Sequence, residues 1–142
     1  MNILLTGAGG FIGSHLDKEL NSEHKVFQVF HSSDYIEGQN SFSVNLTNVS
    51  AVNKLIKDLS KQQKIDAIIH LASAMASSDK IDDVRLLNEN ILIIDNVINI
   101  AKSVKPKIFI NFSSMAVYPN ISGTFSEDSL PTPQKNPDCL YG

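Results

Sequence analysis

A glycine-rich turn near the N-terminus separates a short apolar run from an amphipathic segment. Residues 2–6 (NILLT) read as a strand buried on both faces of a parallel sheet, and Gly7, Gly10 and Gly13 follow it at three-residue spacing. Beyond them, apolar residues recur every three or four positions, which predicts a helix that ends near residue 21. A strand, a glycine turn and a helix in this order direct backbone amides and the positive end of the helix dipole to one spot, where a pyrophosphate can bind.

Each glycine of this turn has a separate task in a dinucleotide site. Gly7 permits the tight turn, Gly10 lets the backbone approach the pyrophosphate, and Gly13 lets the helix pack on the strand. Phe11 and Ile12 lie between these glycines and complete the expected cofactor-binding turn. The sequence therefore predicts a site for NAD or NADP, and a merely structural turn is the alternative.

Strands and helices alternate along the rest of the chain. Residues 25–30, 42–44, 66–71 and 107–112 read as strands, and residues 49–59 and 82–103 read as helices, the first capped by Thr47 or Asn48. This rhythm predicts an α/β fold with a Rossmann-type doubly wound parallel sheet, truncated after the fifth strand region. We expect one NAD(P)-binding domain over residues 1–142, without a substrate-binding C-terminal part. The helical apolar residues expected to face the core are Phe11, Ile12, Leu16, Leu20, Val49, Val52, Leu55, Ile56, Leu59, Leu86, Leu87, Ile91, Ile94, Val97, Ile98 and Ala101.

Composition disfavours several other classes of protein. The net charge is −3 and the basic residues are dispersed, so we expect neither nucleic acid nor an anionic membrane as a partner. No apolar run reaches the roughly 18 residues of a membrane span, and no signal peptide is recognisable, so a cytoplasmic protein is expected. The single cysteine, Cys139, lies in no ligand cluster, and we expect no metal site.

The end of the predicted second strand bears on the choice between NAD and NADP. His31 and Ser32 follow that strand, and the first acidic residue, Asp34, comes later than the carboxylate that usually binds the ribose hydroxyls. A 2′-phosphate would therefore not be repelled, which favours NADP slightly, although Asp34 leaves NAD open. His70, inside an apolar strand, is expected to be a packed or hydrogen-bonded core residue.

These motifs together resemble a known family. The segment TGAGGFIGSHL (residues 6–16) resembles the opening of the extended short-chain dehydrogenase/reductases, the NAD-dependent epimerase/dehydratase group. Asn45 and Leu46 resemble the family's Asp-Leu/Ile pair that meets the adenine, with asparagine in place of aspartate. DAIIHLAS (residues 66–73) resembles the strand and loop along the cofactor, which implies that Leu71, Ala72 and Ser73 contact it.

The resemblance also implies catalytic residues. FSSMAVY (residues 112–118) resembles the family's serine-bearing strand end, which makes Ser114 the catalytic serine, although Pro119 replaces the usual glycine. PDCLYG (residues 137–142) resembles the segment with the Tyr-x-x-x-Lys pair, which makes Tyr141 the catalytic tyrosine. Asn90 matches the asparagine of a helical motif. The expected lysine would lie beyond Gly142, so the chain resembles the first half of such an enzyme, and we expect little or no turnover from it alone.

The function implied by the resemblance is an NAD(P)-dependent epimerase/dehydratase-type oxidoreductase that acts on a nucleotide sugar. A tyrosinate would exchange a proton with a sugar hydroxyl while hydride passes between that carbon and the nicotinamide. The full-length form is expected to be a homodimer. Two alternatives stay open, namely a non-catalytic NAD(P)-binding sensor or scaffold protein and a purely structural α/β domain. The sugar and the reaction type are not specified by these residues.

Overall fold

The structure is a computed structural model that describes residues 1–31, 38–61, 64–75, 84–114, 117–119 and 121–129. The chain divides into two compact units. The first consists of Met1–Ala72 and Leu92–Phe112, and the second of Ser73–Ile91 and Ser113–Gly142. The first unit contains the sheet.

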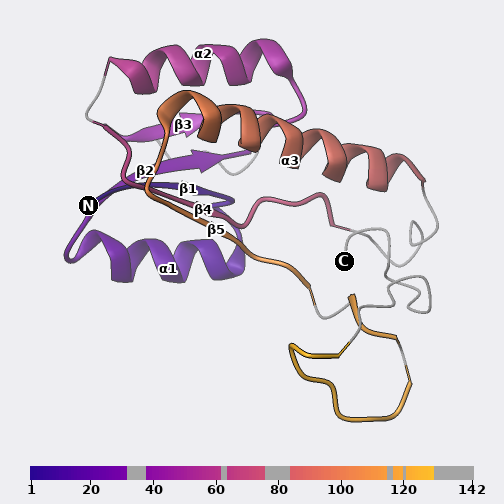
Figure 1. Cartoon of the computed structure of the whole chain (residues 1–142). Coiled ribbons are helices and arrows are strands. Elements are labelled where there is room, and N and C mark those ends of the chain that lie inside the picture. Colours follow the sequence, from indigo (N-terminus) through magenta and orange to yellow (C-terminus); the bar gives the residue numbers. More distant parts are fainter. Residues whose placement is uncertain (32–37, 62–63, 76–83, 115–116, 120, 130–142) are drawn as a thin grey trace. The chain divides into compact units, whose positions relative to one another are not determined.

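A five-stranded parallel sheet forms the centre of the first unit (Figure 1). Its strands are β1 (Asn2–Thr6), β2 (Lys25–Phe30), β3 (Ser41–Ser43), β4 (Ala67–His70) and β5 (Ile108–Asn111). They lie in the order β3-β2-β1-β4-β5, so the chain builds outward from β1 to β3 and then returns to add β4 and β5 on the other side. This confirms the predicted doubly wound Rossmann-type sheet.

Helices cover both faces of the sheet (Figure 1). On one face, α1 (Phe11–Asn21) packs Leu16 and Leu20 against a cluster that includes Ile3 and Leu5 of β1. On the other face, α2 (Val49–Ser60) and the later turns of α3 (Val84–Val104) pack against a cluster that includes Leu4. Successive β1 side chains therefore belong to opposite cores, as expected for a strand buried on both faces.

The first turn of α1 differs from the sequence prediction. Phe11 and Ile12 were expected to face the core, but they are 83% and 54% exposed. The helix starts at the carboxyl edge of the sheet and runs back along it, so only its later turns lie over the strands. These two apolar side chains therefore border the glycine turn rather than the core.

The apolar stripes of the other two helices are also wider than their buried faces. Val49 of α2 and three residues of α3, Leu87, Ile91 and Ile98, were predicted to be buried but are exposed. In α3 a polar residue, Asn96, is buried instead, and its Nδ2 donates a hydrogen bond of 2.7 Å to the carbonyl of Leu46. Periodicity thus located both helices correctly and overestimated how much of each faces the sheet.

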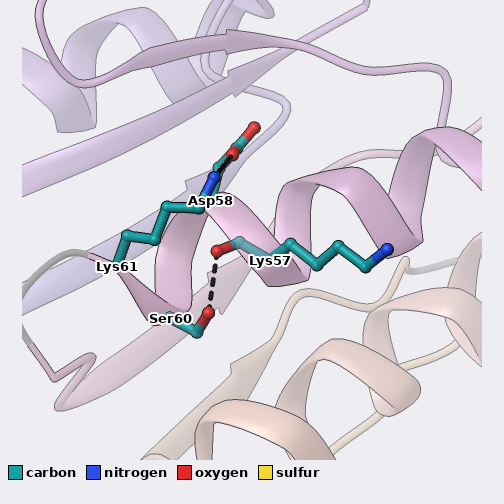
Figure 2. A network of polar contacts seen from close by, with 4 residues as sticks. All are labelled: Lys57, Asp58, Ser60 and Lys61. Carbon is teal, nitrogen blue, oxygen red and sulfur yellow. Dashed lines mark hydrogen bonds and ion pairs between the residues drawn. The ribbon is translucent and has the colours of Figure 1, made fainter.

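The outer side of α2 is polar, as its lysines predicted. Figure 2 shows its last turn, where Lys61 pairs with Asp58 at 3.1 Å and the Ser60 hydroxyl donates to the Lys57 carbonyl at 2.7 Å. An ion pair this exposed contributes about 0–1 kcal/mol, so α2 is held mainly by its apolar face.

Strand β5 is exposed although its sequence is apolar. Ile108, Phe109 and Ile110 are 40–44% exposed. Among the described residues β5 pairs only with β4, which makes it an edge strand.

Candidate functional site

The sheet order reverses beside β1, because β2 and β3 lie on one side of that strand and β4 and β5 on the other. Thr6 and His70, the last residues of β1 and β4, are register partners, so the segments that leave these two strands start side by side. Ligands of open α/β sheets bind at the carboxyl ends of the strands where the order reverses. The glycine turn follows β1 at this point.

The backbone of the turn requires glycine at Gly7. Its φ is +72°, a region that favours glycine, and its N–H donates to the Val29 carbonyl at 3.1 Å. A Cβ atom here would lie 2.8 Å from the Ala72 nitrogen. The turn after β1 and the segment after β4 therefore approach each other too closely for any side chain at this position.

The other two glycines of the predicted motif face different constraints. A Cβ atom on Gly13 would lie 2.1 Å from the Gly7 carbonyl oxygen, so only glycine lets α1 pack this close to the turn. Gly10 is exposed, its φ is −73°, and a Cβ atom there would be 3.3 Å from the same oxygen. Folding requires glycine strongly at Gly13 and only weakly at Gly10.

The first turn of α1 lacks a cap, whereas that of α2 has one. The Asn48 side chain accepts hydrogen bonds from the N–H groups of Ser50 and Ala51, at 3.0 and 3.1 Å, as the sequence predicted for Thr47 or Asn48. Helix α1 begins after Gly10 with no side-chain cap and no acidic residue in its first turn. The first N–H groups of an α-helix have no partner within the helix, so those of α1 are available to an anion.

Three more strand ends place predicted residues at the same edge of the sheet. His31 follows β2 and is exposed, whereas Ser32 lies outside the described residues. Asn45 is exposed after β3, and its Oδ1 accepts from the N–H and the hydroxyl of Thr47, at 2.9 and 2.8 Å.

Leu71 and Ala72 follow β4 and donate their N–H groups to the Thr6 hydroxyl oxygen, at 3.3 and 3.4 Å. The first unit thus gathers most of the predicted cofactor residues at the carboxyl edge of its sheet, with Leu46 buried beneath.

The remaining predicted residues belong to the second unit. Asn90 binds the backbone of Ala74 twice, because its Oδ1 accepts from the N–H at 2.8 Å and its Nδ2 donates to the carbonyl at 3.1 Å. The Ser73 hydroxyl lies 3.7 Å from the Met75 sulfur. Ser114 is partly buried, and its carbonyl accepts from the Val117 N–H at 3.3 Å. Tyr141 lies outside the described residues. The catalytic roles of Asn90, Ser114 and Tyr141 stay predictions.

Sequence reasoning missed two buried polar interactions. The first joins Thr6 and His70, which are 64 positions apart, so no local pattern reveals it. His70 itself is the hydrogen-bonded core residue that was expected. The second is the bond from Asn96 to Leu46, which a signal in the sequence does indicate. Asn96 lies three residues after Ile93 and four before Ile100, and therefore on the core-facing side of α3.

Within the described part of the chain, no helix is both long and apolar enough to span a bilayer. The same residues contain no cluster of three or more metal-binding side chains.

Comparison with known proteins gives consistent matches. The model of the NAD dependent epimerase/dehydratase family matches residues 3–142. Among curated proteins, the D-erythronate dehydrogenase of Haemophilus influenzae is 27% identical over 100% of this chain, and an uncharacterized UDP-glucose epimerase of Bacillus subtilis is 31% identical over 94% of it. The match covers 46% of each of these proteins.

A solved structure shows the same fold. The UDP-glucose 4-epimerase from Bifidobacterium longum, in complex with NAD+ and UDP, superposes with a TM-score of 0.79 at 20% identity. The match covers 99% of this chain and 45% of that one. This chain therefore spans a little under half the length of the proteins that it matches.

Proposed function

Because this chain belongs to the NAD-dependent epimerase/dehydratase family, we propose that it binds NAD(P) at the carboxyl edge of its sheet. It would serve as the cofactor-binding part of an oxidoreductase that acts on a nucleotide sugar. The observation that carries this proposal is the uncapped first turn of α1 behind Gly10, at the point where the sheet order reverses.

The residues at this edge fit a dinucleotide. The pyrophosphate would bind the N–H groups of Phe11, Ile12 and Gly13, because an exposed glycine at Gly10 places no side chain before them. Asn45 and Leu46 would meet the adenine, as the family resemblance implies. The contrast with α2, which caps itself through Asn48, supports a ligand role for the open end of α1.

The preference for NADP over NAD is a further part of the proposal. His31 is exposed directly after β2, where a 2′-phosphate would lie if the adenosine follows the usual path across the sheet. The structural relative was solved with NAD+, so NAD is the alternative dinucleotide.

The proposed chemistry is transfer of a hydride, which the nicotinamide supplies or accepts when it is bound. Ser114 would donate a hydrogen bond to the oxygen of the reacting sugar hydroxyl, and Tyr141 would remove or return the proton of that hydroxyl. Asn90 would hold the backbone of Ala74, which its side chain already binds. The UDP-glucose epimerases among the relatives support a nucleotide sugar as the substrate class.

A pair of charge substitutions tests the cofactor site. Gly10→Asp places a capping carboxylate where the pyrophosphate would bind, and Asn48→Asp places the same charge at the N-terminus of α2. Both caps suit a helix N-terminus, so we expect neither variant to lose more than a few tenths of a kcal/mol of stability. Gly10→Asp should weaken NAD and NADP binding at least tenfold by titration calorimetry, whereas Asn48→Asp should leave both affinities unchanged.

The outcomes of this titration separate the alternatives. If the wild-type chain bound neither dinucleotide, the alternative hypothesis of a purely structural α/β domain would replace the proposal. Equal binding of NAD and NADP, unaffected by His31→Ala, would remove the preference for NADP. Conversion of a UDP-sugar by the protein that contains this chain would exclude a non-catalytic sensor or scaffold.

A further inference from the structure

A buried polar pair joins the ends of β1 and β4 directly beneath the glycine turn. Thr6 is fully buried, His70 is 4% exposed, and the Thr6 Oγ1 and His70 Nδ1 atoms are 2.6 Å apart. The two residues are register partners in adjacent parallel strands, so the contact crosses the sheet at its carboxyl edge. No role for this pair follows from the proposed cofactor contacts.

The hydrogen bonds around the Thr6 hydroxyl determine which atom carries the proton. Its oxygen accepts the N–H groups of Leu71 and Ala72, and a hydroxyl has two acceptor sites and one proton. With both acceptor sites occupied, the proton is directed to His70 Nδ1, which must then be the unprotonated nitrogen. Burial lowers the pKa of His70 to about 4, which agrees with a neutral ring at neutral pH.

The atoms held by this pair form part of the proposed site. Gly7 follows Thr6 directly, and a Cβ atom on it would lie 2.8 Å from the same Ala72 nitrogen that the hydroxyl binds. The Leu71 N–H also donates to the Thr6 carbonyl at 3.2 Å. The spacing between the turn after β1 and the segment after β4 is therefore set at Thr6.

We propose that Thr6 and His70 are positioning residues for the cofactor turn, with the Thr6 hydroxyl donating to Nδ1 of a neutral His70 whose proton is on Nε2. The hydroxyl oxygen then holds the amides of Leu71 and Ala72 against Gly7. This inference rests on the proposed NAD(P) site for its functional consequence, whereas the tautomer is a property of the chain itself.

Matched substitutions test the pair. Thr6→Val removes the hydroxyl and keeps the shape, whereas Thr6→Ser keeps the hydroxyl. In the same way, His70→Leu removes the acceptor, whereas His70→Asn offers an amide oxygen near the position of Nδ1. We expect Thr6→Val and His70→Leu to raise the Kd for NAD(P) about tenfold, and the conservative variants to stay within about threefold of wild type.

A stability control separates positioning from general loss of structure. Val52→Ala removes buried methyl groups from the core-facing side of α2, on one face of the sheet, and should destabilise the chain without changing the Kd. The tautomer of His70 is read independently from the ¹⁵N shifts of its ring in the wild-type chain, where we expect a protonated Nε2 and an unprotonated Nδ1. If Thr6→Val does not fold, the two His70 variants and the tautomer decide the question.

Three results would overturn the inference. A proton on Nδ1 contradicts it whether or not a cofactor binds. Equal Kd values for Thr6→Val and Thr6→Ser contradict the positioning role alone, provided that the wild-type chain binds. Failure of the wild-type chain to bind either dinucleotide overturns the proposed function and the positioning role together.

Discussion

Replacing Gly13 with alanine would place a methyl group against the backbone of the glycine turn. The added Cβ would be 2.1 Å from the Gly7 carbonyl oxygen and 2.9 Å from its carbon. These atoms cannot rotate aside, because the Gly7 N–H donates a hydrogen bond to the Val29 carbonyl and the Gly7 carbonyl accepts one from the Gly10 N–H. To bring this Cβ–oxygen distance from 2.1 Å to ordinary van der Waals contact, α1 would have to retreat from the turn by at least about 1.3 Å.

The magnitude of this effect follows from two opposing terms. Overpacking of a well-packed site costs about 1–3 kcal/mol, and a clash with rigid backbone belongs at the upper end of that range. Alanine is favoured over glycine within a helix by about 1 kcal/mol, which offsets part of the cost. We therefore expect Gly13→Ala to lose about 2 kcal/mol of unfolding free energy, which for a chain of this size lowers Tm by about 6 °C.

The assay is urea denaturation of the wild type, Gly13→Ala and Gly10→Ala under the same conditions. Gly10→Ala is the matched control, since its Cβ would lie 3.3 Å from the same oxygen and its φ suits alanine. Its stability should change by no more than about 0.5 kcal/mol. A Gly13→Ala variant as stable as the wild type, or more stable, would refute the close approach of α1 to the turn.

Two further predictions concern other parts of the first unit. The pKa of His70 is about 4 in the folded chain against 6.5 for an unperturbed histidine, so between these values the unfolded chain binds a proton that the folded chain does not. The free energy of unfolding should therefore be unaffected by this residue above about pH 6.5 and should fall by about 3 kcal/mol as the pH drops to 4. Denaturant melts at several pH values measure this loss. If His70→Asn lost stability with falling pH as steeply as the wild type, the result would contradict this prediction. Asn48→Ala should lose about 1 kcal/mol, because the N–H groups of Ser50 and Ala51 lose their cap. Thermal denaturation followed by circular dichroism measures that loss, and an unchanged Tm would show that water replaces the cap at no cost.

The elements of the fold were predictable because their signals are local. The run NILLT, the three glycines and the spacing of Leu16 and Leu20 fall within one short stretch, and each signal depends only on neighbouring residues. The strand-helix alternation in the rest of the first unit then admits few arrangements other than a parallel sheet, because crossover connections are right-handed. The glycine turn, and His31 after the second strand, were identified for the same reason, whereas Asn45, Leu46, Leu71 and Ala72 were identified from the family resemblance.

The remaining features depend on how distant segments meet. Phe11 and Ile12 continue the apolar pattern of α1, but the strands end before they reach these side chains. The exposure of Ile98 and of β5 likewise depends on what lies opposite each element, which periodicity does not encode. The contact between Thr6 and His70 required the register of two strands that are far apart in sequence. Roles for Ser114 and Tyr141 come from resemblance alone and stay predictions.

Amide chemical shifts in a ¹⁵N-labelled chain, followed as NAD or NADP is added, test the proposed pyrophosphate site most directly. We predict saturable changes that are largest at the N–H groups of Phe11, Ile12 and Gly13, with little change at Ser50 and Ala51, whose amides Asn48 already caps. Saturation without movement of the α1 amides, or no saturation at all, would contradict the account.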